Sequence, residues 1–355
     1  MTQRTRPTPI AVIGIGCVLP DARNPAEFWQ RNLEGHCAIR ELGGSLWDWN
    51  RYFDPHEDAV DRSYSKLGGQ IRDYEFDWRR FRIPPVEAGL INTMQLMVLD
   101  AGAQALDTVK VIPRATTGLF LGATGLGWQR NTGLRVHMQR LLDRVDQAGE
   151  SLGLTPETRR ELLGSIRHTL ESQIGPVTED TVVNTAASVA IGRIAMHYDL
   201  GGIHYGVDAG FASSLAALDV AVKALRDHTI DLAVTGGASE LIAPLELVAF
   251  AKLGGLAHER LAAFDANAEG TLLGEGTVIF ALKRLDDAIR DGEQIRAVIL
   301  GVGGSSDGRG KALVAPRSNG QVLAMRRAWD DAGVDPQTVA FIECHATGTQ
   351  VGDRS

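Results

Sequence analysis

Cysteine is scarce in this chain: the 355 residues contain three, and Cys17, Cys37 and Cys344 stand far apart. No two of them form a CxxC pair or another spacing typical of a metal-ligand set or a disulfide framework. This excludes a disulfide-stapled secreted fold and a structural zinc site, and it is typical of a protein kept reduced in the cytoplasm. We therefore predict a cytoplasmic protein without disulfides, and we expect Cys17 and Cys344 to be core residues.

Clusters of positive charge and long apolar runs are also missing. Lys and Arg number 36 against 44 Asp and Glu, a net charge of −8, and no segment concentrates the basic residues. Nucleic acid and an anionic membrane surface are therefore excluded as expected partners. No uncharged run approaches the ~18 residues that span a bilayer. The apolar run 10–19 follows Arg4 and Arg6 as in a signal peptide. However, Pro20 and Asp21 come next, without a cleavage site of small residues, so we interpret the run as a strand.

Glycine, by contrast, is abundant. The 40 glycines fall mostly at the ends of apolar runs, as in α/β proteins with many tight strand–helix turns. A hydrophobic fraction of 44% and a charged fraction of 23% are ordinary for a globular protein. Composition thus favours a folded α/β protein over a disordered or fibrous one.

The first half of the chain mixes clear elements with a long irregular stretch. Asn24 and Pro25, followed by Glu27, are an N-cap, a first helical residue and an acidic third position. The patterns predict strands at 9–16 and 117–122, helices at 25–33 and 91–106, loops with short elements at 36–90, and an amphipathic helical insertion at about 128–178.

From residue 184 onward, strands and helices alternate, which is typical of layered α/β folds. The patterns predict strands at 203–208, 231–237, 277–283, 296–304 and 339–344, and helices at 184–200, 212–227, 244–252 and 319–332.

Four segments carry candidate chemistry. They are 207–215 (VDAGFASSL), 264–276 (FDANAEGTLLGEG), 306–309 (SDGR) with 315–317 (APR), and 343–353 (ECHATGTQVGD). Together with 13–17 (IGIGC) and Pro20, they resemble the signature segments of a β-ketoacyl synthase domain, in the family's order and at its spacing. The resemblance runs from about Pro9 to Asp353. The helical section before 180 and the run 82–85 (RIPP) are most similar to the ketosynthases of polyunsaturated-fatty-acid and iterative type I polyketide synthases.

This resemblance implies a thiolase-like fold, in which two similar halves are layered as α/β/α/β/α. We expect residues 1–270 to form the N-terminal half and residues 271–355 to be the start of a truncated C-terminal half. The family reaction is a decarboxylative Claisen condensation of acyl and malonyl thioesters on an acyl carrier protein, with no cofactor and no metal. The resemblance also implies a homodimer or a heterodimer of ketosynthase-type chains, in which the strand 203–208 pairs with its twin.

The turn between the strand 203–208 and the helix 212–227 suits nucleophilic catalysis. A helix start offers unpaired N–H groups and the positive end of the helix dipole. A cysteine there loses its proton easily and accepts an acyl group as the thiolate, while the N–H groups stabilise an oxyanion. The resemblance makes His345 the first of the family's two histidines, placed to hold a second oxyanion or to assist decarboxylation. It also implies that Ala212, Thr347 and Thr349 contact substrate.

Two departures from the family pattern change this expectation. Phe211 stands where the family has its nucleophilic cysteine, and a benzyl group can neither attack a thioester nor donate a hydrogen bond. The later family segments, with a lysine, a second histidine and a glycine-rich loop, have no counterpart, so His345 alone remains of three catalytic residues. We expect Phe211 to begin the helix after the turn and to fill the former nucleophile site, away from the exposed surface. An unrelated packing role is the alternative.

Other chemistry-bearing residues have structural interpretations. Ser213 and Ser214 lie inside the helix pattern and lack the GxSxG of a serine hydrolase. The pair Gly14 and Gly16 lacks the third glycine of a dinucleotide site. Three acidic residues of the glycine-rich segment are expected to make structural hydrogen bonds: Asp265, Glu269 and Glu275.

Three functional interpretations remain open. The first is a ketosynthase disabled in condensation by Phe211. The second is a non-catalytic partner resembling a chain-length factor, although such partners commonly lose the histidine segment that is intact here. The third is decarboxylation of malonyl thioesters without acyl transfer, although that chemistry relies on two histidines. Chain length, starter unit, the identity of the carrier protein and the origin of Phe211 do not follow from the sequence.

Overall fold

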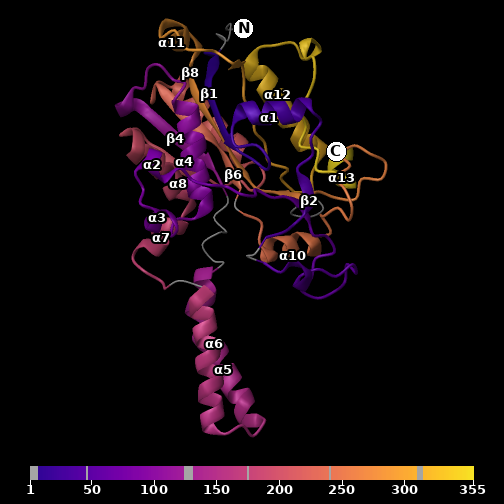
Figure 1. Cartoon of the computed structure of the whole chain (residues 1–355). Helices are drawn as coiled ribbons and strands as arrows, with labels where there is room; N and C mark the ends of the chain where they lie inside the picture. The colour runs from indigo at the N-terminus through magenta and orange to yellow at the C-terminus, as the bar shows by residue number, and fades with distance from the viewer. Residues whose placement is uncertain (1–6, 45–46, 124–130, 174–175, 240, 310–314) are drawn as a thin grey trace.

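A computed structural model describes residues 7–44, 47–123, 131–173, 176–239, 241–309 and 315–355. A six-stranded mixed sheet, in the order β5-β4-β6-β8-β1-β9, lies at its centre (Figure 1). The strands are β1 (Ile10–Val18), β4 (Thr117–Gly122), β5 (His204–Val207), β6 (Leu232–Ser239), β8 (Gly276–Arg284) and β9 (Ala297–Ile299). Strands β4, β5 and β6 are parallel, whereas β8 runs antiparallel to both β6 and β1. The β-branched and small residues of the four inner strands suit strands that are buried on both faces.

Helices cover both faces of this sheet. One apolar core lies under α4 (Thr93–Leu106) and α8 (Ala187–Tyr198), and the other lies under α9 (Ser213–Arg226). Alternate residues of β1 point into the two cores, as the period of a strand requires: Ala11 and Ile13 face one core, and Ile10 and Val12 face the other.

The glycines of β1 allow α4 to lie directly on the strand. A Cβ at Gly14 would lie 2.1 Å from the carbonyl oxygen of Ala105, and one at Gly16 would lie 1.9 Å from that of Ala101. The Gly-x-Gly pattern therefore serves close helix–strand packing. Cys17, at the end of the same strand, is buried, as expected.

Shorter elements surround the main sheet. A second sheet is formed by β2 (Ile39–Glu41), β3 (Leu67–Gly69) and β7 (Leu273–Gly274). The remaining helices are α1 (Pro25–Leu33), α2 (Trp78–Phe81), α3 (Pro85–Ala88), α7 (Asp180–Thr185), α10 (Pro244–Lys252), α11 (Leu285–Arg290), α12 (Ser318–Ala332) and α13 (Gln350–Arg354). The expected Asn24 cap of α1 is confirmed, because its side-chain oxygen accepts a hydrogen bond from the N–H of Glu27 at 2.9 Å.

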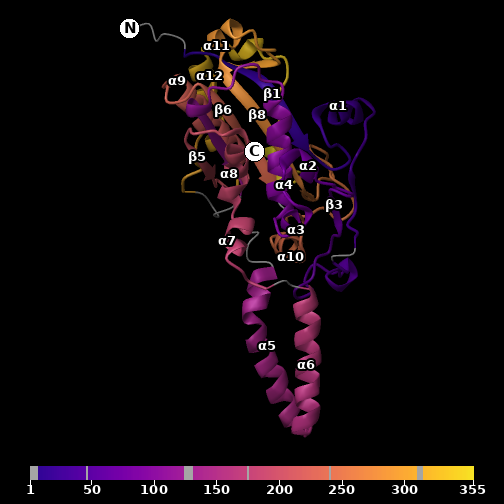
Figure 2. The ribbon, with the colours of Figure 1, turned by 60° about the vertical axis from the view of Figure 1, so that its left-hand side comes forward.

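The section expected as a helical insertion contains α5 (Asn131–Ser151) and α6 (Pro156–Gln173). These two helices form a hairpin that projects away from the sheet in both views (Figures 1 and 2). Met138 and Leu142 of α5 are buried, and Arg159 of α6 pairs with Asp146 and Glu150. Residues 128–130 and 174–175 of the expected section lie outside the described residues. The half boundary near 270 remains a prediction.

Of the two strand predictions nearest the C-terminus, one was wrong and the other was too long. The run 339–344 forms no strand, because no described strand lies beside it, and Phe341, Ile342 and Cys344 are exposed. Cys344 is therefore not a core residue. The predicted strand 296–304 is reduced to β9, because the chain then turns onto α12, where a Cβ at Gly301 would lie 2.4 Å from the Ala332 nitrogen.

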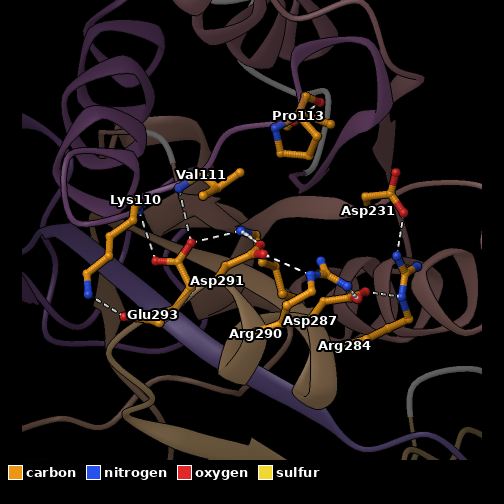
Figure 3. Close-up of polar contacts among 12 residues, drawn as sticks. Lys110, Val111, Pro113, Asp231, Arg284, Asp287, Arg290, Asp291 and Glu293 are labelled. Atoms are coloured by element: carbon orange, nitrogen blue, oxygen red, sulfur yellow. Dashed lines mark hydrogen bonds and ion pairs between the residues drawn. The ribbon is translucent and has the colours of Figure 1, made fainter.

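A buried ion cluster fixes the end of β8 (Figure 3). The Nζ of Lys283 lies 2.8 Å from carboxylate oxygens of both Asp291 and Glu293. The Glu293 carboxylate also accepts the backbone N–H groups of Lys110 and Val111, at 2.9 and 3.2 Å. The loop that leads toward β4 is thus tied to β8 through one buried carboxylate.

The next residue of β8 anchors the segment between α9 and β6. Arg284 donates to the carbonyl oxygens of Leu225 and Ile230, both at 2.8 Å. It also pairs with Asp231 and Asp287, as Figure 3 shows. The C-terminal end of α9 is therefore held in place on β8. This matters because the opposite end of α9 carries the candidate site.

Candidate functional site

The turn between β5 and α9 is held by its own side chains. The hydroxyl of Ser213 accepts the N–H of Ala209 at 2.9 Å and donates to the carbonyl oxygen of Gly210 at 2.6 Å. The carboxylate of Asp208 accepts the N–H of Gly210 at 3.1 Å. Gly210 has a φ of 58°, a left-handed conformation that glycine adopts without strain. Ser213 is thus a structural residue, as expected.

The first turn of α9 lies against the ends of two parallel strands. A Cβ at Gly122, the last residue of β4, would lie 2.4 Å from backbone atoms of Ser213. A Cβ at Gly237 of β6 would lie 2.6 Å from the Cβ of Ser214. The glycines allow this close approach, so the helix start lies at the carboxyl ends of β4, β5 and β6, where open α/β sheets commonly bind ligands.

Phe211 lies two residues before the first residue of α9, close to the predicted helix start but outside the helix. Helix α9 begins at Ser213, and the N-cap residue Ala212 supplies no side-chain hydrogen bond. The expectation that Phe211 is enclosed was wrong, because its side chain is 78% exposed. In the described part of the chain, its ring contacts those of Phe250 and His345, at centroid distances of 5.8 and 6.4 Å. These two rings flank the benzyl group without covering it.

His345 lies in the segment after the run that was expected to be a strand. Its side chain is exposed, and the next residue, Ala346, has a left-handed φ of 47°. Thr347 and Thr349 follow, with hydroxyl oxygens 2.9 Å apart, and Thr349 caps α13 by accepting the N–H of Gly352 at 3.2 Å. Both expected threonines therefore fix the segment locally.

Two contacts dock this segment onto the glycine-rich loop. The carboxylate of Asp353 accepts the N–H of Gly348 at 3.1 Å and the N–H of Phe264 at 2.6 Å. A Cβ at Gly348, where φ is 73°, would lie 2.6 Å from the carbonyl oxygen of Gly270. The histidine segment thus owes its place beside Phe211 to the loop 264–270.

The acidic residues of the glycine-rich segment make structural hydrogen bonds, as expected. Glu275 is buried, and its carboxylate accepts the N–H groups of Ile71 and Ile242, both at 2.8 Å. Because Ile242 lies just before α10, Glu275 helps to position the helix that carries Phe250. Asp265 accepts the N–H of Asn267 at 2.8 Å. Sequence reasoning missed Phe250, since nothing in the pattern of α10 indicates which element that helix meets.

The three thiols of the chain lie outside the turn before α9. Burial, with a smaller contribution from Glu27, raises the pKa of the Cys17 thiol to about 12, so it is protonated at neutral pH. Cys37 and Cys344 are exposed.

Two surface cavities of about 380 Å³ each lie away from the turn before α9, one beside α1 and one lined by Trp47 and Trp49. Across the described ranges, no group of three or more His, Cys, Asp or Glu side chains is placed to hold a metal ion, and no helix is long and apolar enough to cross a membrane.

Comparisons with known proteins identify the family. The sequence model described as beta-ketoacyl synthase, N-terminal domain, matches residues 7–288, and that of the C-terminal domain matches residues 296–355. Among curated proteins, a mycocerosic acid synthase-like polyketide synthase of Mycobacterium tuberculosis is 33% identical over 99% of this chain and 15% of its own length. One chain of the polyunsaturated fatty acid synthase from Thraustochytrium is 33% identical over 98% of this chain and 12% of its own length.

Solved structures agree with this assignment. An oxazolomycin ketosynthase domain of Streptomyces albus has a TM-score of 0.80 and 26% identity, covering 98% of this chain and 54% of its own. The ketosynthase of module 6 of the bacillaene synthase from Bacillus subtilis has a TM-score of 0.76 and 27% identity, covering 97% and 52%. The chain therefore spans about half of the solved ketosynthases and less of the curated synthases. Its fold is thiolase-like, and the chain belongs to the β-ketoacyl synthase family.

Proposed function

We propose that this chain is a ketosynthase region of polyketide or fatty-acid assembly that takes no acyl group from a carrier-protein thioester. The observation that carries this proposal is the position of Phe211. Its ring stands at the start of α9 and lies 6.4 Å from the imidazole of His345, centroid to centroid. A carbon-only side chain occupies the place where condensation needs a nucleophile.

The chemistry follows from what each group can do. Acyl transfer requires an attacking atom with a lone pair, which forms a tetrahedral intermediate whose oxyanion must then be stabilised. The start of α9 still offers the positive end of a helix dipole, with no side-chain cap from Ala212 to occupy it. His345 supplies an exposed imidazole. Electrostatic stabilisation thus persists, but no bond can form to the benzyl group of Phe211.

An acylation experiment tests this proposal. The chain is incubated with an acyl-carrier protein or an acyl-CoA, and its intact mass is measured. The unaltered chain is expected to gain no acyl group. Phe211→Cys is expected to gain one, because its thiol would stand at the helix start. Phe250→Cys is the matched control: the same substitution is made on a neighbouring ring inside α10, and it is expected to stay unmodified.

Two results would contradict the proposal. An acyl adduct on the unaltered chain, mapped to residues 205–215, would show another nucleophile in the turn. Equal acylation of Phe211→Cys and Phe250→Cys would show that the helix start has no special role. Measuring the far-ultraviolet circular dichroism of each variant ensures that only folded chains are compared.

A non-catalytic partner role is the second candidate, and the edge of the sheet favours it. β5 is an outermost strand that pairs only with β4 among the described strands, and Tyr205 on it is 46% exposed. Helix α9, which packs against β5, carries the exposed apolar side chain of Leu215. Such an edge is normally covered in the assembled protein. We therefore propose that β5 meets a second ketosynthase-type chain, either another copy or an active synthase.

Co-purification distinguishes these two assemblies. A tagged copy of this chain is expressed with an intact ketosynthase from the same source and, separately, with an untagged copy of itself. Recovery of the intact synthase, together with condensation that depends on both chains, supports the non-catalytic partner. Recovery of the untagged copy alone supports a homodimer.

A further inference from the structure

A cleft beside α1 is lined by arginines from separate segments. It has a volume of about 380 Å³ and lies among the turn after β1, helix α1, strand β2 and the turn after β3. Helix α1 stands at the side of the molecule, away from the central sheet (Figure 2). The four arginines are Arg23, Arg31, Arg40 and Arg72.

Two of these guanidinium groups bind carbonyl oxygens. Arg23 donates to the backbone carbonyl of Asp73, and Arg72 donates to that of Glu41 at 2.7 Å. Neither arginine forms an ion pair with a carboxylate among the described residues. A carbonyl oxygen orients a guanidinium group without neutralising its charge. Each of the two therefore keeps a full positive charge and most of its five N–H donors.

Two of the acidic residues in the cleft already have partners. The carboxylate of Asp21 lies 2.9 Å from Nε2 of His36 and 2.5 Å from a guanidinium nitrogen of Arg40. Burial alone would raise the pKa of Asp21, but hydrogen bonds from His36 and Arg40 lower it overall, so the group stays ionised. The Glu27 carboxylate accepts the backbone N–H of Arg23 at 2.8 Å.

Two of the four arginines are already neutralised. Arg31 pairs with Glu34 at 3.3 Å and Arg40 pairs with Asp21, so Arg23 and Arg72 are the cleft arginines that no described carboxylate pairs with. Arginine forks match the geometry of phosphate oxygens and bind them by charge-assisted hydrogen bonds.

The walls between the arginines are apolar. Leu19, Ala22 and Ile71 line the cleft. Its volume of about 380 Å³ is in the range of small-molecule sites and exceeds what a lone ion needs. The cleft thus fits a charged head with a compact apolar body.

The turns that frame the cleft have a defined backbone. Leu19 and Ala22 exchange two backbone hydrogen bonds of 2.7 and 3.1 Å. Asp21 and Asp73 both have left-handed φ values, 59° and 55°. Such conformations are uncommon outside glycine, and here they place the peptide groups that orient Arg23 and Arg72.

We propose that this cleft binds a phosphate monoester with a small apolar group, held by Arg23 and Arg72. This site is separate from the Phe211 turn and does not depend on the function proposed for it. Free phosphate shares the same head chemistry, so the two sources must be distinguished by experiment.

Titration calorimetry of the 355-residue chain with phenyl phosphate and with inorganic phosphate makes this distinction. We expect saturable binding of phenyl phosphate, with inorganic phosphate weaker because it leaves the apolar wall uncovered. Arg23→Gln and Arg72→Gln are each expected to weaken phenyl phosphate about 10-fold, through the loss of a charge-assisted contact. Arg62→Gln is the matched control, since Arg62 also donates to a backbone carbonyl but lies outside the cleft.

Each other outcome overturns part or all of the proposal. Absence of saturable binding to the folded chain overturns it, as does equal weakening by Arg62→Gln. Equal affinity for both ligands restricts the site to phosphate and overturns the ester assignment. If Arg23→Gln fails to fold, Arg72→Gln, whose contact is with an exposed segment, decides the result.

Discussion

The ring of Phe211 lies 6.4 Å from the imidazole ring of His345, although the two residues belong to segments far apart in the chain. Phe211 is placed by the turn before α9, and His345 is placed by the contact of Gly348 with the loop that contains Gly270. The two segments thus bring a benzyl group and an imidazole side by side at the start of α9. Mutations in these two segments therefore test two properties separately: the reactivity of residue 211 and the packing that holds His345 in place.

A cysteine introduced at position 211 is expected to be unusually acidic. The start of α9 favours the thiolate, so the thiol pKa of Phe211→Cys is expected below the ordinary value of about 8.5. The rate of alkylation by iodoacetamide as a function of pH measures this pKa. Phe250→Cys, inside α10, provides the reference. Identical pH profiles for the two variants would show that the dipole at the start of α9 does not reach residue 211.

Gly348→Ala is expected to release the histidine segment from the glycine-rich loop. The new Cβ would meet the carbonyl oxygen of Gly270 at 2.6 Å, and φ at this position is left-handed. Hydrogen exchange of residues 345–353 is expected to increase. Gly35→Ala is the control, because it has a similar φ of 65° with no atom within 4 Å of the added carbon. That control is expected to cost about 1 kcal/mol and to leave 345–353 protected.

The sequence predicted the local part of this site and missed the tertiary part. The short strand, the glycine turn and the apolar stripe of α9 follow from residues next to one another, and the structure places Phe211 before α9 accordingly. Exposure of Phe211 and its contact with Phe250 depend on where α10 and the segment around His345 dock. The residues next to Phe211 in the sequence do not indicate how these distant segments pack around it.

The same reasoning explains the failed strand prediction. The run 339–344 has the β-branched and aromatic residues of a buried strand, but a strand exists only where a neighbour accepts its hydrogen bonds. None of the described strands lies beside it. Gly14 and Gly16 illustrate the opposite case. Their spacing was visible in the sequence, but the close approach of the α4 backbone, which requires glycine at both positions, was not.

Glu293→Gln is expected to be strongly destabilising at neutral pH. The mutation leaves Lys283, which is 2% exposed, with one carboxylate partner instead of two. Breaking a buried ion pair costs about 3–5 kcal/mol in the free energy of unfolding. Chemical denaturation measures this cost. Glu157→Gln, which removes an exposed pair with Arg160, is the control and is expected to change stability by less than about 1 kcal/mol. Equal effects of the two variants would contradict a structural role for the buried cluster.

The same cluster predicts the direction of the pH dependence. Burial would raise the pKa of Glu293, but hydrogen bonds from Lys110, Lys283 and Val111 lower it overall, and a hydrogen bond from Lys283 lowers the pKa of Asp291. A carboxyl whose folded pKa lies below its unfolded value contributes stability above the unfolded pKa, about 4. That contribution is lost as pH falls through the folded pKa. Unfolding measured from pH 7 downward is expected to show a shallower acid limb in Glu293→Gln; an unchanged slope would contradict the assignment.

The free edge of β5 gives the last prediction. A two-fold pairing of β5 with its twin would bring each Tyr205 close to the same strand of the other copy, so Tyr205→Lys places like charges at a self-complementary contact. Light scattering at micromolar concentration is expected to give a dimer for the unaltered chain and a monomer for Tyr205→Lys. Tyr205→Phe keeps the ring that packs edge-on against Phe120 and is expected to remain dimeric. Val298→Lys places the same charge on β9, at the opposite edge of the sheet, and is also expected to remain dimeric. A monomer in all four samples would remove β5 as a self-association edge, and a loss of dimer in Val298→Lys alone would move the interface to β9.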